Sequence, residues 1–430
     1  MRRLVTTLRT LVRRFAKGYG SLGHLKNPDL ALLALAGLFA SMSHSIIVPL
    51  LPAYADSLGA GPVFIGLLFG APAAVQAICS PLFGYLADRM ARKPLICFGI
   101  ALGVGSVAAL GVASGPLALL ALRGLDGLAL AMQQPATTAY IGDQYADDER
   151  GGALGAFKSA GLVGVAVGPA LGGALSLWGT LGTPFLVLGT VTVFVGVFLV
   201  FRLPRARPSE VNTDENDTGG SDSPRFALAD FRGTLTISMV ALAASVFVSQ
   251  LGTGAFGPFL APLLEARVGG GPEYASLAWS AFGLAMVLAM PIGGTLADRW
   301  GRKPMLIVSK LVWAAVVCGP ALATVPQIPP VLLLVAGVAS AFGGPAMGAL
   351  QYEVAPKGRE ATVLGIYSAL ASAGVAVGPI LGGWVVGQWG LVALFLTMGA
   401  LWAADTLTIA FGVRESNAEE LNDKQRTTGS

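Results

Sequence analysis

The chain contains Gly84-Tyr85-Leu86-Ala87-Asp88-Arg89-Met90-Ala91-Arg92-Lys93-Pro94 and, 210 residues later, Gly294-Thr295-Leu296-Ala297-Asp298-Arg299-Trp300-Gly301-Arg302-Lys303-Pro304. A second pair of segments repeats at the same offset, Gly-Pro-Ala-Leu-Gly-Gly at 168–173 and Gly-Pro-Ile-Leu-Gly-Gly at 378–383. Two different motifs that recur with one spacing indicate an internal duplication. The chain is therefore built from two related halves.

The composition places both halves in a membrane. Charged residues make up 12% of the chain and apolar residues 54%, whereas soluble domains carry about 25% charged residues. The apolar runs continue for about twenty residues or more, as spanning helices require, and do not alternate as barrel strands do. The twelve runs lie at about 30–52, 62–87, 94–113, 116–141, 152–177, 183–202, 234–264, 274–297, 304–325, 329–352, 361–387 and 391–412.

These runs predict an all-α integral membrane protein whose twelve transmembrane helices form two six-helix bundles related by pseudo-two-fold symmetry. Parallel repeats of this kind are typical of transporters, whose substrate site lies between the halves near the bilayer midplane. The polar segments give five parts: a basic N-terminal arm at 1–29, a first bundle at 30–202, a cytoplasmic linker at 203–232, a second bundle at 233–413 and a cytoplasmic tail at 414–430. Apolar residues at helical spacing between residues 4 and 15 allow either an interfacial helix or an unordered basic arm.

Basic residues predict the orientation. If both termini are cytoplasmic, the inside collects the basic residues of the two turns at 88–94 and 298–304, of the linker and of both tails, whereas the outer loops hold only Arg267. The positive-inside rule then predicts a multi-pass protein of the cell membrane, most simply a bacterial inner membrane, with both termini in the cytoplasm. Because the basic clusters serve as topology signals and lipid contacts, we expect membrane lipids and no nucleic acid as partners.

Neither catalysis nor a metal site is indicated. Cys79, Cys97 and Cys318 fall within apolar runs without paired spacing, and His24 and His44 are the only histidines. No pairing of a nucleophile with a base and no phosphate-binding loop is recognisable. We therefore expect a protein that is not an enzyme and has no metal site.

The repeated basic turns are candidates for cytoplasmic gates. In each turn an aspartate ends a span and arginines follow it directly; these residues are Asp88, Arg89 and Arg92, and Asp298, Arg299 and Arg302. Such an aspartate can pair with the arginines and with the positive N-terminus of a helix in the opposite half. Asp143 and Glu353, also 210 residues apart, are expected to join the charge cluster of their own half. The alternative, that these charges only set topology, does not explain a repeated acid.

The two turns, each between the second and third spans of a half, resemble the signature loop of the major facilitator superfamily. The resemblance covers essentially the whole membrane part of the chain. It implies a transporter but not a direction, because importers and exporters share the loop. Ala91 departs from the pattern, since the family usually has there the glycine found at Gly301, and we expect the tight turn of the first half to form less readily.

Glycines repeat along the fifth and eleventh spans. The string Gly161-x-x-Gly164-x-x-x-Gly168-Pro169-x-x-Gly172-Gly173 is similar to the motif of proton-coupled antiporters, notably twelve-helix multidrug and tetracycline exporters. The resemblance implies export and implies that the fifth span packs on the eighth and the eleventh on the second. We expect the stripes to seal the two halves on the side away from the cytoplasm, although such stripes also pack helices within one bundle. The residues are Gly164, Gly168, Pro169, Gly172, Gly173, Gly378, Pro379, Gly382 and Gly383.

Proton coupling requires a group that can exchange a proton within the membrane. Arg123 and Asp126 lie on one face of the fourth span, and charges at this depth are usually retained for function. Arg123-x-x-x-Gly127 resembles the fourth-span motif of the antiporters, with Asp126 in place of the usual glutamine. Asp126 would be the titrating acid, which Arg123 keeps ionised until a proton or a substrate breaks the pair; the alternative is a permanent ion pair. His44 is a second candidate, and no cofactor is expected besides protons as the coupling ion.

The substrate cavity is predicted from polar and aromatic residues of the spans. These are Phe39, Gln133, Gln134, Thr137, Lys158, Phe256, Phe259 and Tyr367. Lys158 could equally extend to the cytoplasmic surface, and Asp405 lies in a span that is commonly peripheral. Tetracycline exporters and vesicular amine carriers have an aspartate nine residues before the first-span proline, where this chain has Ala40. A strongly cationic substrate would lack that counter-ion, which favours a lipophilic or weakly polar compound.

These observations favour a secondary active transporter, monomeric in the membrane, that carries out proton-coupled efflux of small amphipathic or lipophilic compounds by alternating access. A facilitative or proton-coupled nutrient importer is the first alternative, but it would be expected to line its cavity with more hydrogen-bonding side chains. A lipid flippase or a non-transporting membrane sensor is the second, and a flippase would need a lateral opening for acyl chains.

Overall fold

The computed structural model describes residues 20–202, 236–356 and 359–413. The amphipathic segment at 4–15, the linker at 203–232 and the tail at 414–430 lie outside the described residues. The described helices are η1 (Gly20–Lys26, a 3-10 helix), α2 (Pro28–Ser45), α3 (Ile47–Ser57), α4 (Pro62–Arg89), α5 (Arg92–Leu110), α6 (Pro116–Gln144), α7 (Asp147–Ser176), α8 (Thr183–Arg202), α9 (Ile237–Val268), α10 (Pro272–Trp300), α11 (Arg302–Leu322), α12 (Ile328–Val354) and α13 (Glu360–Gly412).

The described helices contain the twelve predicted spans. α2 and α3 together form the first span, and α13 contains the eleventh and twelfth. The one-residue break at Ile46 has a cause in the sequence, because Pro49 lacks an N–H and its ring approaches the carbonyl of Ser45. The prediction of an all-helical membrane protein with six spans in each half is therefore confirmed.

Helix starts are encoded by proline and by capping side chains. Pro28, Pro62 and Pro116 occupy first helical positions, where an N–H would have no partner within the helix. The side chain of Asn27 caps α2 by accepting a hydrogen bond from the backbone N–H of Asp29, at 3.0 Å. At the C-terminal end of α9, Gly269 adopts φ 69° and closes the helix as a left-handed cap.

The two basic turns differ in backbone conformation. Gly301, between α10 and α11, has φ 91°, which a side chain would disfavour. Its counterpart Ala91, between α4 and α5, has φ −58° and ψ 130°. Alanine in the first turn thus avoids the left-handed region that glycine adopts in the second half, and that this turn forms less readily stays a prediction.

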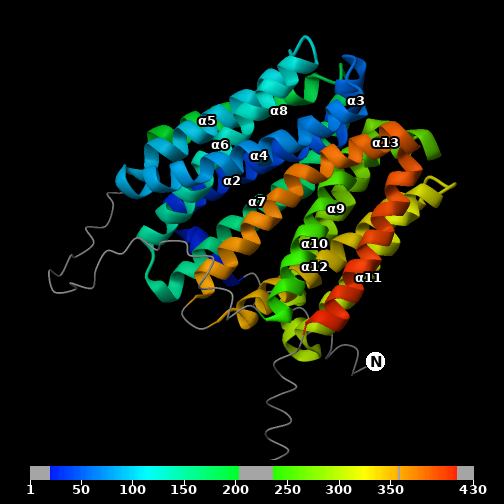
Figure 1. Ribbon diagram of the computed structural model, residues 1–430. Coiled ribbons are helices and arrows are strands. Elements are labelled where there is room, and N and C mark those ends of the chain that lie inside the picture. The colour runs from blue at the N-terminus through cyan, green and yellow to red at the C-terminus, as the bar shows by residue number, and fades with distance from the viewer. Residues whose placement is uncertain (1–19, 203–235, 357–358, 414–430) are drawn as a thin grey trace, which may run out of the picture.

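The halves pack through the helix pairs implied by the resemblance. α4 packs on α13, and α7 packs on α10. Figure 1 shows the first half, coloured from blue through cyan to green, beside the second half in light green to red, with α13 running along α4. Within α13 the backbone bends at Gly390, which has φ 82° and ψ 172°, between the eleventh and twelfth spans.

Apolar packing is shared at one end of the molecule and separate at the other. One core contains buried residues of both halves, among them Leu50, Leu68, Phe259 and Leu264. A second core lies beside the 88–93 turn and contains residues of the first half only, and a third lies beside the 298–303 turn and contains residues of the second half only. The halves are therefore joined at the end remote from the basic turns and packed independently at the end that carries them.

Candidate functional site

A cavity of about 590 Å³ lies between the halves, on the basic-turn side of their shared core. Most of its wall comes from α2, α5, α6 and α7 of the first half. The second half contributes Trp279 and Phe282 of α10. This volume is in the range of ligand pockets that enclose drug-sized molecules.

A buried ion pair lies at the cavity wall, to which its Asp126 contributes. Arg123 and Asp126 are each 3% exposed, and the Nη1 of Arg123 donates to Oδ2 of Asp126. The Nε of Arg123 donates to the carbonyl of Leu68 in α4, at 3.0 Å. Because a buried charge is costly without partners, these contacts keep the guanidinium and the carboxylate in place.

His44 connects this pair to the cavity. Its Nδ1 lies 3.4 Å from Oδ2 of Asp126, while its side chain is 41% exposed and lines the cavity. His44 belongs to α2 and Asp126 to α6, so the contact joins two helices of the first half. The structure thus brings the three residues predicted for proton coupling into one group.

Close helix packing positions the ion pair. A Cβ at Gly127 would collide with the backbone of Pro72, and a Cβ at Gly99 would lie 3.1 Å from the backbone N of Gln133. Glycines at these positions therefore let α6 approach α4 and α5 closely. The approach to α4 brings Arg123 within hydrogen-bond distance of the Leu68 carbonyl.

The predicted cavity residues are only partly correct. Gln133, Gln134 and Lys158 line the cavity. The other five residues, Phe39, Thr137, Phe256, Phe259 and Tyr367, do not contribute to its wall. The aromatic side chains of the wall are instead Phe157, Trp279 and Phe282.

The five residues that do not line the cavity instead pack between helices. Phe256 and Phe259 are each 1% exposed within the shared core, and Phe39 packs against that core. Thr137 is buried, and the hydroxyl of Tyr367 donates to the backbone carbonyl of Met239 at 3.3 Å. Residue type suggested a cavity, but the helix face that carries each side chain decides its surroundings.

The basic turns form the predicted ion pairs within each half. The Nε of Arg92 lies 3.2 Å from Oδ2 of Asp143, and Arg302 pairs with Glu353 at the equivalent place. Asp143 and Glu353 thus each pair with an arginine of the basic turn of their own half, and their part in gating stays a prediction. The guanidinium of Arg89 stacks on the ring of Tyr85, with its carbon 4.3 Å from the ring centroid. The side chains of Asp88, Asp298 and Arg299 lie outside the described part, so their role in gating stays a prediction.

The glycine stripe packs within one half, contrary to the expectation that it seals the two halves. A Cβ at Gly164 would meet the carbonyl of Leu38, and a Cβ at Gly168 would meet Ser45 and the carbonyl of Met42, all in α2 of the same half. Gly172 faces Ile46 and Leu50 in the first span, and Gly378 and Gly382 face α9 in their own half. The stripe therefore packs the fifth span on the first and does not seal the two halves.

Contact between the halves comes from the neighbouring residues of the same motif. Gly173 faces Ser276 of α10, and Gly383 faces the backbone of Pro62 in α4. The carbonyl of Pro379 abuts Gly66, also in α4, whereas Pro169 lines the cavity. Successive residues on a helix point about 100° apart. In each Gly-Gly pair, the first glycine therefore faces its own half and the second faces the other half.

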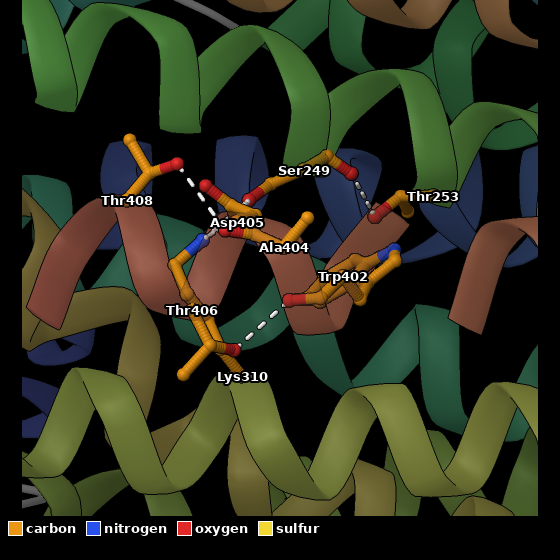
Figure 2. A network of polar contacts seen from close by, with 8 residues as sticks. All are labelled: Ser249, Thr253, Lys310, Trp402, Ala404, Asp405, Thr406 and Thr408. Atoms are coloured by element: carbon orange, nitrogen blue, oxygen red, sulfur yellow. Dashed lines mark hydrogen bonds and ion pairs between the residues drawn. The ribbon is translucent and has the colours of Figure 1, made fainter. Parts of the chain in front are cut away.

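The second half contains a buried polar group that the sequence interpretation missed. Lys310 of α11 pairs with Oδ2 of Asp405 in α13 and donates to Oγ of Ser249 in α9, at 2.6 Å. Ser249 Oγ lies 3.1 Å from the same carboxylate oxygen. Figure 2 shows these three side chains converging beside Trp402, whose ring centroid is 5.6 Å from the Lys310 ammonium.

This group is enclosed by protein. Lys310 is 3% exposed and Asp405 is 4% exposed, and neither lines the cavity. The second carboxylate oxygen of Asp405, Oδ1, has no hydrogen-bond partner among the described residues. A signal for the pair was available, because one lysine and one aspartate in apolar spans of the same half are expected to pair with each other.

Comparison with known proteins identifies the relatives of this architecture. The family model described as "Major Facilitator Superfamily" matches residues 33–241 and 242–428. The multi-drug resistance efflux pump PmrA of Streptococcus pneumoniae is 26% identical over 397 residues, which cover 89% of this chain and 94% of that protein. The multidrug resistance protein MdtG of Citrobacter koseri is 27% identical over 380 residues, covering 85% of this chain and 90% of that protein.

Solved structures share the fold at low sequence identity. A bacterial homologue of the human lysosomal transporter Spinster, in an inward-facing and occupied conformation, aligns with a TM-score of 0.68 at 16% identity, covering 89% of this chain and 94% of that one. The nucleoside transporter NupG aligns with a TM-score of 0.71 at 16% identity, covering 89% of this chain and 98% of that one. The arrangement of two six-helix bundles is thus shared with these transporters.

Proposed function

Because the chain belongs to the major facilitator superfamily, and is a membrane transporter rather than an enzyme, we propose that it exports small amphipathic or lipophilic compounds from the cell in exchange for protons. The single observation that carries this proposal is the group Arg123, Asp126 and His44 at the cavity wall. It combines a buried ion pair with a titratable side chain that is open to the cavity. Such a group can exchange a proton with the compartment that the cavity faces.

The protonation steps follow from the contacts. The imidazole ring of His44 can accept a proton on a ring nitrogen, and its side chain is open to the cavity. Its Nδ1 touches Oδ2 of Asp126, and the same oxygen accepts the hydrogen bond of Arg123. A proton passed to Asp126 removes the negative charge that balances Arg123, while the guanidinium keeps its hydrogen bond to the Leu68 carbonyl and its position over the Phe69 ring. Protonation of Asp126 therefore leaves a buried guanidinium without its counter-ion.

Alternating access has a structural counterpart in the distribution of apolar packing. The halves share a core at one end and keep separate cores at the end with the basic turns, so the cavity opens toward the latter. The positive-inside rule assigns that end to the cytoplasm, with both termini on the same side. This conformation would accept substrate from the cytoplasm. Rocking the halves about the central site would then separate Gly173 from Ser276 and Gly383 from α4.

Export is favoured over import by the relatives and by the cavity wall. PmrA and MdtG are named as a multi-drug resistance efflux pump and a multidrug resistance protein. The wall is mostly apolar, since 15 of its 24 residues have no hydrogen-bonding side chain. An apolar wall suits compounds that partition into membranes, which is the class that an efflux transporter removes.

The test uses the purified protein in liposomes with an imposed pH gradient and a panel of aromatic compounds of different charge. We expect at least one compound to move uphill, in the direction opposite to the flow of protons. We also expect the pH of the lumen to change when substrate alone is added. A fluorescent pH probe inside the liposomes records the second effect. Compound movement that does not depend on the gradient would contradict proton coupling. Movement in the same direction as protons would contradict export and support import.

A further inference from the structure

We infer that the compounds taken up by this cavity are amphipathic organic anions, whose acidic group pairs with Lys158. The inference rests on the proposed export function and specifies its substrate class. It starts from the sign of the charge that the cavity presents. Three titratable side chains contribute to the wall, namely His44, Asp126 and Lys158.

The negative charge in the wall is already compensated. The side chain of Asp126 is only 5% exposed, and it pairs with Arg123 behind the wall and with His44 at the surface. A cationic ligand would therefore meet a carboxylate that is nearly covered and already has two partners. Breaking the contact with Arg123 would leave a buried guanidinium without its counter-ion, which is costly.

The positive charge of Lys158 has no such compensation. Lys158 is exposed on α7 and contributes to the cavity wall. No acidic side chain in the described part of the chain lies within ion-pair distance of its ammonium group. The charge of Lys158 is therefore left over in the cavity wall, whereas that of Asp126 is paired. A carboxylate, sulfonate or phosphonate on the ligand would supply the missing partner.

The position of Lys158 matches a ligand with one charged end. It lies eleven residues from the start of α7, which is roughly 16 Å along the helix at about 1.5 Å per residue. Phe157 precedes it, and Gly161 and Leu162 follow one turn later on the same wall. Trp279 and Phe282 of the second half supply an aromatic surface for the apolar part of the ligand.

The test compares three ligands that share one ring system and differ in charge: naphthoate, naphthamide and naphthylmethylammonium. Equilibrium binding of each radiolabelled compound is measured on the purified full-length protein in detergent. The variants are Lys158→Gln and Lys158→Glu. Lys26→Glu is the matched control, because Lys26 is exposed and lies outside the cavity wall, so it reports any effect of net charge alone.

We expect the parent protein and Lys26→Glu to bind naphthoate about tenfold more tightly than naphthamide, and naphthylmethylammonium most weakly, since one ion pair in a partly wet site contributes about this factor. Lys158→Gln should remove the preference for the anion, and Lys158→Glu should reverse it. Thermal unfolding of each variant, measured in parallel, separates loss of binding from loss of fold.

Two results would overturn the inference. The first is the same order of affinities in the parent protein and in Lys158→Glu, which would mean that the lysine extends to the surface and leaves the cavity. The second is absence of saturable naphthoate binding to a folded parent protein. Neither result removes the export proposal, which fails if the liposome assay shows no proton-driven movement of any compound or shows movement in the same direction as protons. The two failures are therefore distinguishable.

Discussion

Each half of the molecule buries an ion pair between its helices, and the surroundings of the two pairs differ. In the first half, Asp126 touches His44, whose side chain is 41% exposed to the cavity. In the second half, the Lys310–Asp405 pair is completed by Ser249 and lies outside the cavity wall. The same type of interaction thus occurs once with access to transported molecules and once without it.

The duplicated architecture makes this difference informative. The positions equivalent to Arg123 and Asp126 are Leu333 and Ala336, so the cavity-side pair exists in one copy only. Residue 100, which corresponds to Lys310, is isoleucine. The two halves therefore keep one backbone arrangement and differ in their buried charges: under the proposed function the first half exchanges protons, whereas the pair in the second half links α9, α11 and α13.

The largest expected effect is loss of proton-driven transport in Asp126→Asn. The amide cannot take up and release a proton as the Asp126 carboxylate would, so uphill transport should fall to background while downhill exchange is partly retained. Liposome transport with and without a pH gradient measures both activities. Asp405→Asn is the matched control and should still concentrate substrate. If Asp126→Asn concentrates substrate, or Asp405→Asn does not, the assignment of tasks to the halves is wrong.

The second prediction concerns stability. Lys310→Met leaves the Asp405 carboxylate buried without its cation and should lower the free energy of unfolding by about 3–5 kcal/mol. The double variant Lys310→Met/Asp405→Leu removes both charges and should recover most of this loss, with transport intact. Equilibrium unfolding in mixed micelles measures the effect. A double variant that is stable but inactive would place the second pair in the transport mechanism.

The third prediction uses the Gly-Gly motifs, where the two halves behave alike. Gly168→Ala and Gly378→Ala should each destabilise their own half by about 1–3 kcal/mol, because the added methyl meets the backbone of the first span of that half. Gly173→Ala and Gly383→Ala should instead loosen the contact between halves. Labelling of a cysteine placed at Ser276 would report the second effect. Increased labelling in Gly168→Ala but not in Gly173→Ala would reverse the assignment of the two glycines.

The smallest expected effect is at the basic turns. The pairs of Arg92 with Asp143 and of Arg302 with Glu353 are partly exposed, so Asp143→Asn and Glu353→Gln should each change the free energy of unfolding by less than about 1 kcal/mol. Double-mutant cycles in low and high salt measure both couplings. A coupling several times larger in either half would show that its turn is held by more than an exposed ion pair.

Repeats, spans and paired charges could be predicted from the sequence. The offset between repeated motifs places Arg92 with Asp143 and Arg302 with Glu353, because residues at equivalent positions of related halves make equivalent contacts. The contact between His44 and Asp126 follows from the small number of intramembrane titratable groups, which must find partners. These features depend on spacing and residue type alone.

Cavity aromatics and the glycine faces could not be predicted in this way. Phe256 is in the shared core, whereas Phe282 lines the cavity, although both are aromatic residues in spans of the second half. The difference depends on how each helix is rotated about its axis, and in a membrane both faces of a helix are apolar. For the same reason the motif identified which helices meet but not which of Gly172 and Gly173 faces the other half.

The backbone at Gly390 has a consequence for how the protein is made. Its φ of 82° and ψ of 172° interrupt α13 at a single residue, so the eleventh and twelfth spans follow each other without a polar loop. Trp384 and Trp389 stack edge to face just before the bend, as expected for aromatic residues at a membrane surface. During biosynthesis the last two spans would therefore enter the bilayer together, as one hairpin. Reporter tags or epitopes inserted at this bend would separate the two helices and block their joint insertion.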